Sequence, residues 1–503
     1  MRLSRGLFLT ILLLAFSTIL VNAQTGYDIS LTCNGLDRQT VKFAFYVGTS
    51  QYLKDSTTTD SKGRCVFRGK EKLSPGVYIF VMPGNKYFEF LLENDQVFSV
   101  TCNFKESAAS VADGEQPATG KDIWKNYEVT AIKFKGSDLN DNFLSYESGW
   151  QDLQKKDAEL KKQFQKLKGM PSEQEAAKQE INDQEAKMKV WLTGEAGKNN
   201  GTLLGAIIRS IIPVSIPEYV VPATITNQDS AKRLWSYIYY KNHFFDNVEL
   251  TNPGLIRSPV LATKLDQFFS DVVVQAPDSI NKETDKLLKK CSSQKEVYQY
   301  VTSWIFNKYA SSQYMGHDAV VVHIADSVYL AGKAPWAGNE FIADLAKKVN
   351  RLRPNLIGLK APDLVMSSFT GNYVSLYDVK ADFTILYFWE PDCGHCKVAT
   401  PKLMEWYKQN KDKGIEVFAV CTKDDKQVWE KYITDHDLTW INGWDPDRLS
   451  HFDYFYNVES TPLIYILDRD KNIIAKRLSV EDIGPFIDSY RKAQNLTGAR
   501  SAR

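Results

Sequence analysis

Apolar and polar residues alternate with a period of two along the first part of the chain, between residues 27 and 104. Ser74-Pro75-Gly76 and Pro83-Gly84-Asn85 interrupt the alternation as turn signals. A period of two is typical of strands with one buried face. We therefore predict a small antiparallel β-sandwich over residues 24–120, with strands in the runs Val41–Val47, Cys65–Phe67, Val77–Met82, Tyr87–Leu92 and Val97–Cys102.

The period becomes helical from about residue 121. Asp152–Lys168 and Glu173–Leu192 read as two charged helices around a Gly-Met-Pro turn, with Ser172 and Glu175 placed for a capping box. Their apolar positions are few, which favours a projecting helical hairpin. We expect an all-α domain over residues 121–352, with further helices at Leu203–Ile212, Ala231–Lys241, Val260–Val274, Ile280–Lys290, Glu296–Tyr309, Asp318–Leu330 and Asn339–Val349. Their dense aromatic residues predict core packing rather than a substrate-binding face.

Strands and helices alternate in the last part of the chain, after a linker at residues 353–358. This alternation predicts an α/β domain over residues 353–503, and the whole chain is then a multidomain protein. The expected elements are a hairpin (Leu364–Phe369 with Tyr373–Leu376), strands Thr384–Trp389, Ile415–Cys421, Leu463–Leu467 and Ile473–Leu478, helices Lys426–His436 and Pro446–Phe455, and a final helix.

The first 23 residues have the order of a secretory signal. Arg2 and Arg5 precede an apolar run, Leu7–Leu20, and Val21-Asn22-Ala23 forms a small-residue cleavage site before Gln24. The run is short for an uncleaved membrane anchor. We therefore predict a signal peptide at 1–23 and a mature protein that is periplasmic, or otherwise exported, in a Gram-negative bacterium.

Composition narrows the choice of partners. Apolar residues make up 43% of the 503 positions and charged residues 24%, which is ordinary for a globular protein. The formal net charge is +1, so no basic excess points to nucleic acid. No stretch after the signal is apolar for long enough to span a membrane.

Two cysteines, Cys393 and Cys396, stand where the apolar run Thr384–Trp389 meets a predicted helix. A cysteine at a helix N-terminus faces unpaired N–H groups and the positive end of the helix dipole, and both favour the thiolate. Zinc would need a second ligand pair, which the chain lacks, and haem attachment would need His where Lys397 stands. A thiol peroxidase would need a Pro/Thr constellation before its cysteine, and the segment before Cys393 lacks it. A purely structural disulfide remains the alternative.

The stretch FWEPDCGHCK, with Pro401 beyond it and Thr461-Pro462 before a strand, resembles the thioredoxin superfamily, and in particular its secreted TlpA-like oxidoreductases. The resemblance implies a thioredoxin-like fold with a cis Pro462 packed against the cysteine pair. Gly394-His395 is the dipeptide of protein disulfide isomerase and implies a more oxidising pair than that of thioredoxin. The residues expected to support the cysteines are Gly394, His395, Trp389, Glu390, Lys397, Thr461 and Pro462.

Two positions depart from the superfamily pattern. Tyr387 occupies the place of a buried acid that helps to deprotonate the second cysteine, which leaves Glu390 as the candidate proton acceptor. Asp392 replaces a tryptophan before the first cysteine, and its charge opposes a thiolate there.

We therefore expect an exported thiol–disulfide oxidoreductase in which Cys393 attacks and Cys396 resolves the mixed disulfide. Protein thiols or disulfides would be its substrates, with a membrane or periplasmic redox partner. Antioxidant activity would follow from such a pair, and the direction of electron flow stays open. The alternative is a partner- or ligand-binding protein in which the pair is structural or senses redox state.

No cofactor beyond the Cys393–Cys396 pair is expected. His317 and His323 lie close together in the sequence, but we predict no metal there. Cys33, Cys102 and Cys421 read as buried thiols. A disulfide between Cys33 and Cys102 is the open alternative in an oxidising compartment.

Overall fold

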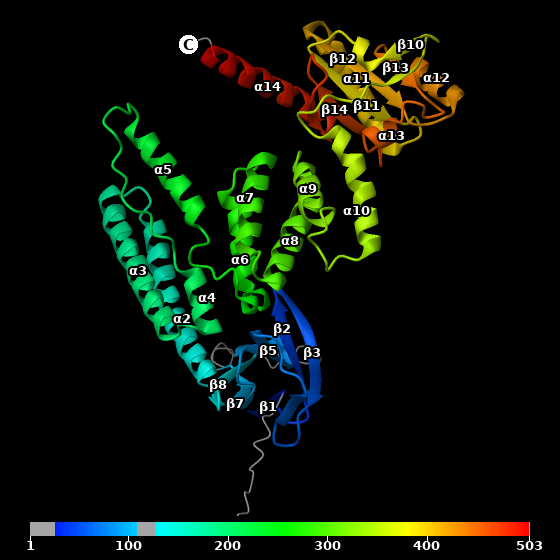
Figure 1. The fold of residues 1–503 in the computed structure, drawn as a ribbon. Helices are drawn as coiled ribbons and strands as arrows, with labels where there is room; N and C mark the ends of the chain where they lie inside the picture. Colours follow the sequence, from blue (N-terminus) through cyan, green and yellow to red (C-terminus); the bar gives the residue numbers. More distant parts are fainter. Residues whose placement is uncertain (1–25, 108–125, 502–503) are drawn as a thin grey trace, which may run out of the picture. The chain divides into compact units, whose positions relative to one another are not determined.

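The computed structural model describes residues 26–107 and 126–501, with side chains described up to residue 494. The chain divides into two compact units, residues 1–264 and 265–503, and each is described by itself (Figure 1). The predicted signal peptide and its cleavage site lie outside the described residues. Among the residues described, no helix has the length and apolar character needed to cross a membrane.

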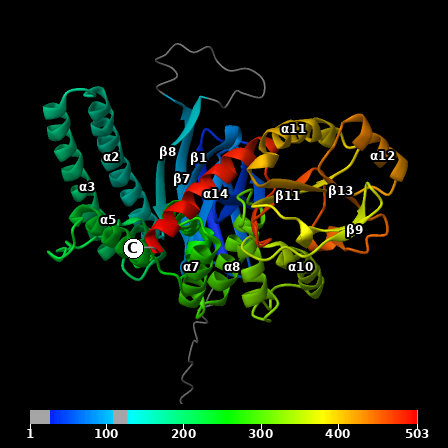
Figure 2. The same ribbon diagram turned by 90° about the horizontal axis from the view of Figure 1, so that it is seen from above.

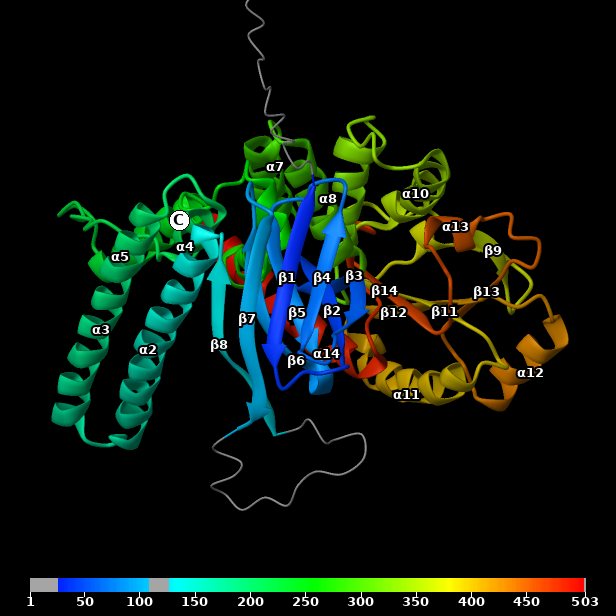
Figure 3. The same ribbon diagram turned by 90° about the horizontal axis from the view of Figure 1, so that it is seen from below.

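The first unit begins with two four-stranded sheets, ordered β4-β1-β7-β8 and β3-β2-β5-β6 (Figure 3). Both sheets contribute to one buried core, in which the rings of Phe43 and Phe67, one from each sheet, lie 5.2 Å apart. Five strands, β2 and β4 to β7, match the predicted runs, because alternate residues of these runs are apolar and face this core. β1 and β3 lie outside the predicted runs, β3 is largely exposed, and β1 pairs in parallel with β7 rather than antiparallel as predicted. The strands are β1 (Tyr27–Asn34), β2 (Thr40–Val47), β3 (Ser50–Thr58), β4 (Arg64–Gly69), β5 (Gly76–Met82), β6 (Lys86–Leu92), β7 (Val97–Glu106) and β8 (Tyr127–Lys135).

Strand β8 was not predicted, and it moves the expected boundary at residue 120. It pairs antiparallel with β7 from Ser99–Lys135 to Glu106–Tyr127. Phe134 of β8 is buried against Phe98, with ring centroids 5.9 Å apart. The β region therefore extends to Lys135.

The predicted helical hairpin is present and is longer than expected (Figure 3). The predicted capping box is wrong: Met170 is the N-cap of α3, Pro171 follows it, and Ser172 instead hydrogen-bonds the Glu173 carboxylate at 2.9 Å. The aromatic side chains of α5 are also not core residues, since none of its residues is buried. The helices are α2 (Asp138–Lys166), α3 (Pro171–Lys198), α4 (Leu203–Ile211) and α5 (Gln228–His243), and α6 (Pro259–Gln267) spans the boundary between the units.

The second unit opens with helices that carry a buried aromatic core, including Phe306 and Tyr309, as predicted for this region. Two α-helices were predicted to end at Val274 and Leu330. Each becomes π-helical in its last turn, over Phe268–Val272 and Ala325–Tyr329 respectively. The predicted linker after α10 is a further helical turn, Arg353–Asn355. The helices are α7 (Pro277–Cys291), α8 (Lys295–Ala310), α9 (Asp318–Ile324) and α10 (Asn339–Leu352).

A seven-stranded sheet, ordered β10-β9-β13-β12-β11-β14-β15, forms the rest of the unit. Its central strand β11 is buried on both faces, and α11 lies along one of them (Figure 2). The strands are β9 (Val365–Ser368), β10 (Tyr373–Ser375), β11 (Phe383–Trp389), β12 (Ile415–Cys421), β13 (Ile441–Trp444), β14 (Leu463–Leu467) and β15 (Ile473–Lys476), and the helices are α11 (Gly394–Asn410), α12 (Lys426–Asp435), α13 (Phe452–Phe455) and α14 (Val480–Ser501).

Two predictions for this region need correction. Strand β13 was missed. The helix expected over Pro446–Phe455 begins only at Phe452, because the Asp445 carboxylate accepts the N–H groups of Leu449 and Ser450 at 3.1 and 2.8 Å and holds that segment as a loop.

Candidate active site

The two cysteines lie at the junction between β11 and α11, as the sequence predicts. Strand β11 pairs in parallel with β12 and antiparallel with β14, so it is fixed from both sides. Cys393 is the N-cap of α11 with extended backbone angles, and Cys396 lies in the first turn. The helix therefore presents its free N-terminal N–H groups to the Cys393 sulfur.

The two thiols have opposite electrostatic environments. Burial alone would raise the pKa of Cys393, but hydrogen bonds with the Cys396 backbone, the Thr461 side chain and the Cys396 thiol bring its pKa below the ordinary value. Burial raises the pKa of Cys396 to about 11, although the Glu390 backbone hydrogen-bonds its sulfur. Cys396 is fully buried, as predicted, whereas Cys393 is half-buried rather than openly exposed. These environments favour the thiolate of Cys393 over that of Cys396.

The loop before β14 covers Cys393. The Thr461–Pro462 peptide bond is cis, as the resemblance implied. The Cys393 thiol donates a hydrogen bond to the Thr461 carbonyl oxygen, with the sulfur and oxygen 3.3 Å apart. The Thr461 N–H has no partner in the described part of the chain. The residue whose carbonyl oxygen contacts the Cys393 sulfur therefore also offers a backbone donor that is free in that part of the chain.

No acid takes the place that Tyr387 occupies near Cys396. Tyr387 is fully buried, and its hydroxyl shares a 2.8 Å hydrogen bond with Thr400, four residues beyond Cys396 on α11. Burial raises the pKa of Tyr387 well above its ordinary value, so the hydroxyl is neutral. Thr400 was not among the predicted residues, although its place one turn after Cys396 was visible in the sequence.

The Glu390 carboxylate is bound elsewhere. Its Oε1 accepts a hydrogen bond from the Thr422 hydroxyl at 2.8 Å, and its Oε2 lies 4.0 Å from the Lys423 ammonium. The backbone of Glu390, rather than its carboxylate, contacts the Cys396 sulfur. These contacts disfavour Glu390 as the immediate proton acceptor. Sequence reasoning missed Thr422 and Lys423, which reach the site only because β12 pairs with β11.

The remaining predicted residues surround the pair at different depths. Trp389 is fully buried in the core with Cys396, and its ring lies 5.1 Å from that of Tyr432. Gly394, His395 and Lys397 are exposed. Asp392 is exposed as well, and its charge does not prevent the lowered pKa of Cys393.

The other cysteines are buried thiols. Burial raises the pKa of Cys421 and of Cys65 to about 12. Cys33 and Cys102 are opposite each other in the register of β1 and β7, and both are free.

The two histidines weighed as metal ligands have separate partners. His317 contacts the Ser312 hydroxyl and His323 the Asp285 carboxylate, each at 2.8 Å. Within residues 26–107 and 126–501, no group of three or more His, Cys, Asp or Glu side chains is arranged to hold a metal ion.

Comparisons with known proteins agree with this geometry. Residues 357–476 match the model of the AhpC/TSA family, and residues 27–143 match a domain of unknown function (DUF4369). The thiol–disulfide oxidoreductase ResA of Geobacillus kaustophilus is 29% identical over 138 residues, which cover 27% of this chain and 78% of the relative. ResA of Bacillus cereus is 26% identical over 120 residues, covering 24% and 68%.

A solved domain of a possible thiol-disulfide isomerase from Cytophaga hutchinsonii is 41% identical, with a TM-score of 0.27, and covers 28% of this chain and 97% of that domain. From the family match and the sequence relatives, this protein is an enzyme, a thiol–disulfide oxidoreductase with a thioredoxin-like C-terminal domain.

Proposed function

We propose that the protein exchanges disulfides with polypeptide substrates outside the cytoplasm, and that Cys393 is the attacking and Cys396 the resolving cysteine. One observation carries the assignment: the thiol with the lowered pKa is the accessible one, and the thiol with the raised pKa is buried one helical turn away. The thiolate is the nucleophile in disulfide exchange.

In the reducing direction the Cys393 thiolate attacks one sulfur of a substrate disulfide. A Cys393–substrate bond forms, the substrate S–S bond breaks, and the other substrate sulfur leaves as a thiolate. Cys396 then loses its proton and attacks Cys393, which releases the second substrate sulfur and leaves a Cys393–Cys396 disulfide. The substrate gains two electrons and the enzyme loses them. A dithiol partner must return the electrons, and a more oxidising partner would drive the same steps in reverse.

The hydrogen-bonding groups of the Thr461 backbone favour a polypeptide as the substrate. Its N–H is unpartnered in the described part of the chain, and its carbonyl oxygen lies 3.3 Å from the Cys393 sulfur. An extended segment that pairs with both groups, in the manner of an added strand, would bring its own cysteine to Cys393.

Reduction of a polypeptide disulfide by the full mature chain tests this function. With dithiothreitol as the electron source and insulin as the substrate, the wild type should accelerate reduction above the reagent alone. Cys393→Ser should abolish the acceleration, and Cys396→Ser should reduce it strongly because the mixed disulfide is not resolved. If Cys393→Ser kept the wild-type rate, the assignment would be wrong.

Export belongs to the same proposal and rests on the order of residues 1–23. The intact mass of the protein isolated from its native host should correspond to a chain that begins at Gln24. A product that retains Met1 in a cytoplasmic fraction would contradict export. The alternative of a binding protein with a purely structural pair is not favoured by the relatives, which are named as oxidoreductases.

A further inference from the structure

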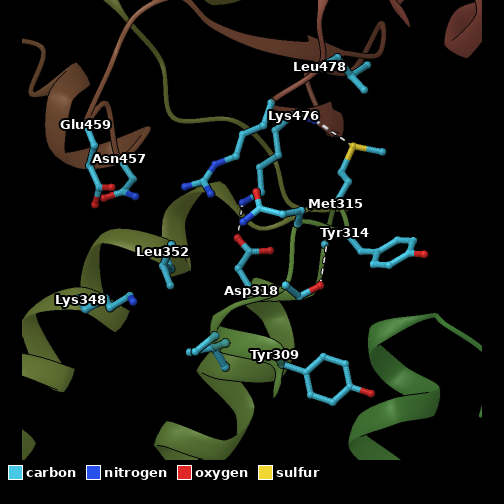
Figure 4. Close-up of a pocket in the computed structure, with 16 residues that line it drawn as sticks. Tyr309, Tyr314, Met315, Asp318, Lys348, Leu352, Asn457, Glu459, Lys476 and Leu478 are labelled. Carbon is cyan, nitrogen blue, oxygen red and sulfur yellow. Dashed lines mark hydrogen bonds and ion pairs between the residues drawn. The ribbon is translucent and has the colours of Figure 1, made fainter. Parts of the chain in front are cut away.

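A cavity of about 310 Å³ lies in the second unit beside the loop that carries Pro462. It is enclosed by the α8–α9 connection, by α10, by the end of β15 and by residues 457–459 (Figure 4). The cavity is distinct from the cysteine pair, because neither Cys393 nor Cys396 lines it.

The helical wall of this cavity is held rigidly against the sheet. The Lys476 side chain, only 5% exposed, donates hydrogen bonds to the Asp318 carboxylate and to the Asn355 carbonyl and side-chain oxygens, the last two at 2.7 and 2.9 Å. The Lys476 N–H points to the sulfur of Met315 at 3.2 Å. The cavity is therefore formed before anything binds, which lowers the ordering cost of binding.

A neighbouring cavity reaches the loop that carries Pro462. A second, smaller cavity is lined by Ser460, Pro462 and Leu463, and it shares Asn457 and Glu459 with the first. Thr461, between Ser460 and Pro462, contacts the Cys393 sulfur. A third cavity, along α10, also includes Asn457 and Glu459. We call these three cavities, which share Asn457 and Glu459, the groove.

Polar groups without partners face the groove. Asn457 is a buried residue, 7% exposed, that lines all three cavities, and its side chain makes no hydrogen bond within the described residues. Figure 4 shows it beside Glu459 on the wall opposite α9. One oxygen of Asp318, Oδ1, is buried and likewise unpartnered in the described part of the chain. A buried polar group without a partner is unfavourable, so a ligand that supplies the missing hydrogen bonds is stabilised there.

The groove carries an excess of positive charge. Lys348, Arg351 and Arg477 line it, and none of them has an ion pair among the described residues. Glu459 contributes the negative charge that opposes these three positive charges, because the Asp318 charge is offset by Lys476. An acidic ligand is thus electrostatically favoured over a basic one.

We infer that the groove binds the segment of a polypeptide substrate next to its reacting cysteine and selects segments with acidic side chains. The inference rests on the proposed function, because the substrate cysteine must be at Cys393 for its neighbours to reach the groove. Thr461 contacts Cys393, and Asn457, four positions before Thr461, lines the groove, so the acidic side chains would lie about four residues of extended chain from that cysteine, at about 3.3 Å per residue. The helical region of the second unit would then determine substrate choice.

The test uses two synthetic peptides whose single cysteine is held in a mixed disulfide with a coloured aromatic thiol. One peptide carries two Asp residues about four positions from the cysteine, and the other carries two Lys residues there. The simple aromatic disulfide, which cannot reach the groove, is the third substrate. Attack by Cys393 breaks the mixed disulfide and releases the coloured thiolate, so the second-order rate constant is read directly.

For the reduced full chain at low salt, the Asp peptide should react about three- to tenfold faster than the Lys peptide. The double variant Lys348→Glu/Arg351→Glu should remove or reverse the preference, and Asn457→Asp should weaken it. All variants should keep the wild-type rate with the simple disulfide. Lys333→Glu is the control: it reverses one positive charge, against two in the double variant, on the same unit at an exposed lysine outside the groove, and it should change nothing.

Equal rates for the two peptides, or a preference that the groove variants leave intact, would overturn the inference while leaving the proposed function standing. A protein that reacts with the simple disulfide but with neither peptide would overturn both. A loss of the preference with Lys333→Glu as well would point to general charge effects, and would also overturn the inference.

Discussion

The buried state of Cys396 should make the second half of the proposed catalytic cycle strongly pH-dependent. With a pKa of about 11 against an ordinary value of 9.0, about 1 in 10,000 Cys396 thiols is ionised at pH 7 rather than about 1 in 100. A more basic thiolate is also more nucleophilic, by roughly eightfold for two pKa units. The net effect is a resolving step about tenfold slower at pH 7 than that of an unperturbed thiol at the same distance. Its rate should rise almost tenfold per pH unit up to pH 10.

An aromatic disulfide with a coloured leaving thiolate measures both steps in one stopped-flow trace. The first release reports attack by Cys393 and should level off below pH 9, because its pKa is lowered. The second release reports attack by Cys396 on the mixed disulfide and should keep rising. Cys396→Ser should give the first phase alone, and Tyr387→Phe should leave the second phase rising in the same way. A second phase that levels off below pH 9 in the wild type would refute the reasoning. Loss of the second phase in Glu390→Gln would identify Glu390 as the proton acceptor for Cys396.

Two further predictions concern stability, and both are measured by denaturant unfolding of the full chain. Phe43→Ala should destabilise the first unit by about 3–5 kcal/mol, because Phe43 is fully buried between the two sheets. Leu53→Ala is the control: this residue of β3 is 62% exposed, and its loss should change the stability by less than about 0.5 kcal/mol. Equal effects of the two substitutions would contradict the described core. Lys476→Met should destabilise the second unit by about 3–5 kcal/mol, because it leaves the Asp318 carboxylate unpaired. Lys471→Met breaks only hydrogen bonds to the Val379 carbonyl and the Thr384 hydroxyl, and it should destabilise the unit by about 1–3 kcal/mol. A larger effect of Lys471→Met would contradict the account of the Lys476 contacts.

The sequence was most informative where one local signal decides the structure. The run Phe383–Trp389 is apolar over the length of a strand, and the two cysteines follow at once, so both the element and its reactive end could be predicted. Strand β13 was not predictable in this way, because it is four residues long and contains Asn442 and Gly443, which are uncommon in strands. It is held by pairing with β12 and by hydrogen bonds of the Asn442 amide to the Leu438 and Trp440 carbonyls at 2.8 and 3.0 Å.

The environment of the cysteines needed the fold. Thr461 and Cys393 are 68 positions apart, and nothing local to either indicates the 3.3 Å contact between them. The groove is more dispersed still, since Lys348 comes from α10 and Asn457 and Arg477 from two separate loops. A stripe of aromatic residues was also ambiguous: on α8 Phe306 and Tyr309 are buried, as expected, while on α5 no residue is buried. Periodicity shows which residues share a face, but not whether another element covers it.

Disulfide mapping of a trapped complex tests the central claim most directly. The full-length Cys396→Ser variant, expressed in the native host and isolated after acid quenching and alkylation, cannot resolve its mixed disulfides. Peptide mass analysis should find polypeptide cysteines joined to Cys393, and Cys393→Ser should yield no comparable complexes. Complexes joined through Cys421 or another buried cysteine, or equal yields from the two variants, would contradict the assignment of Cys393 as the attacking thiol.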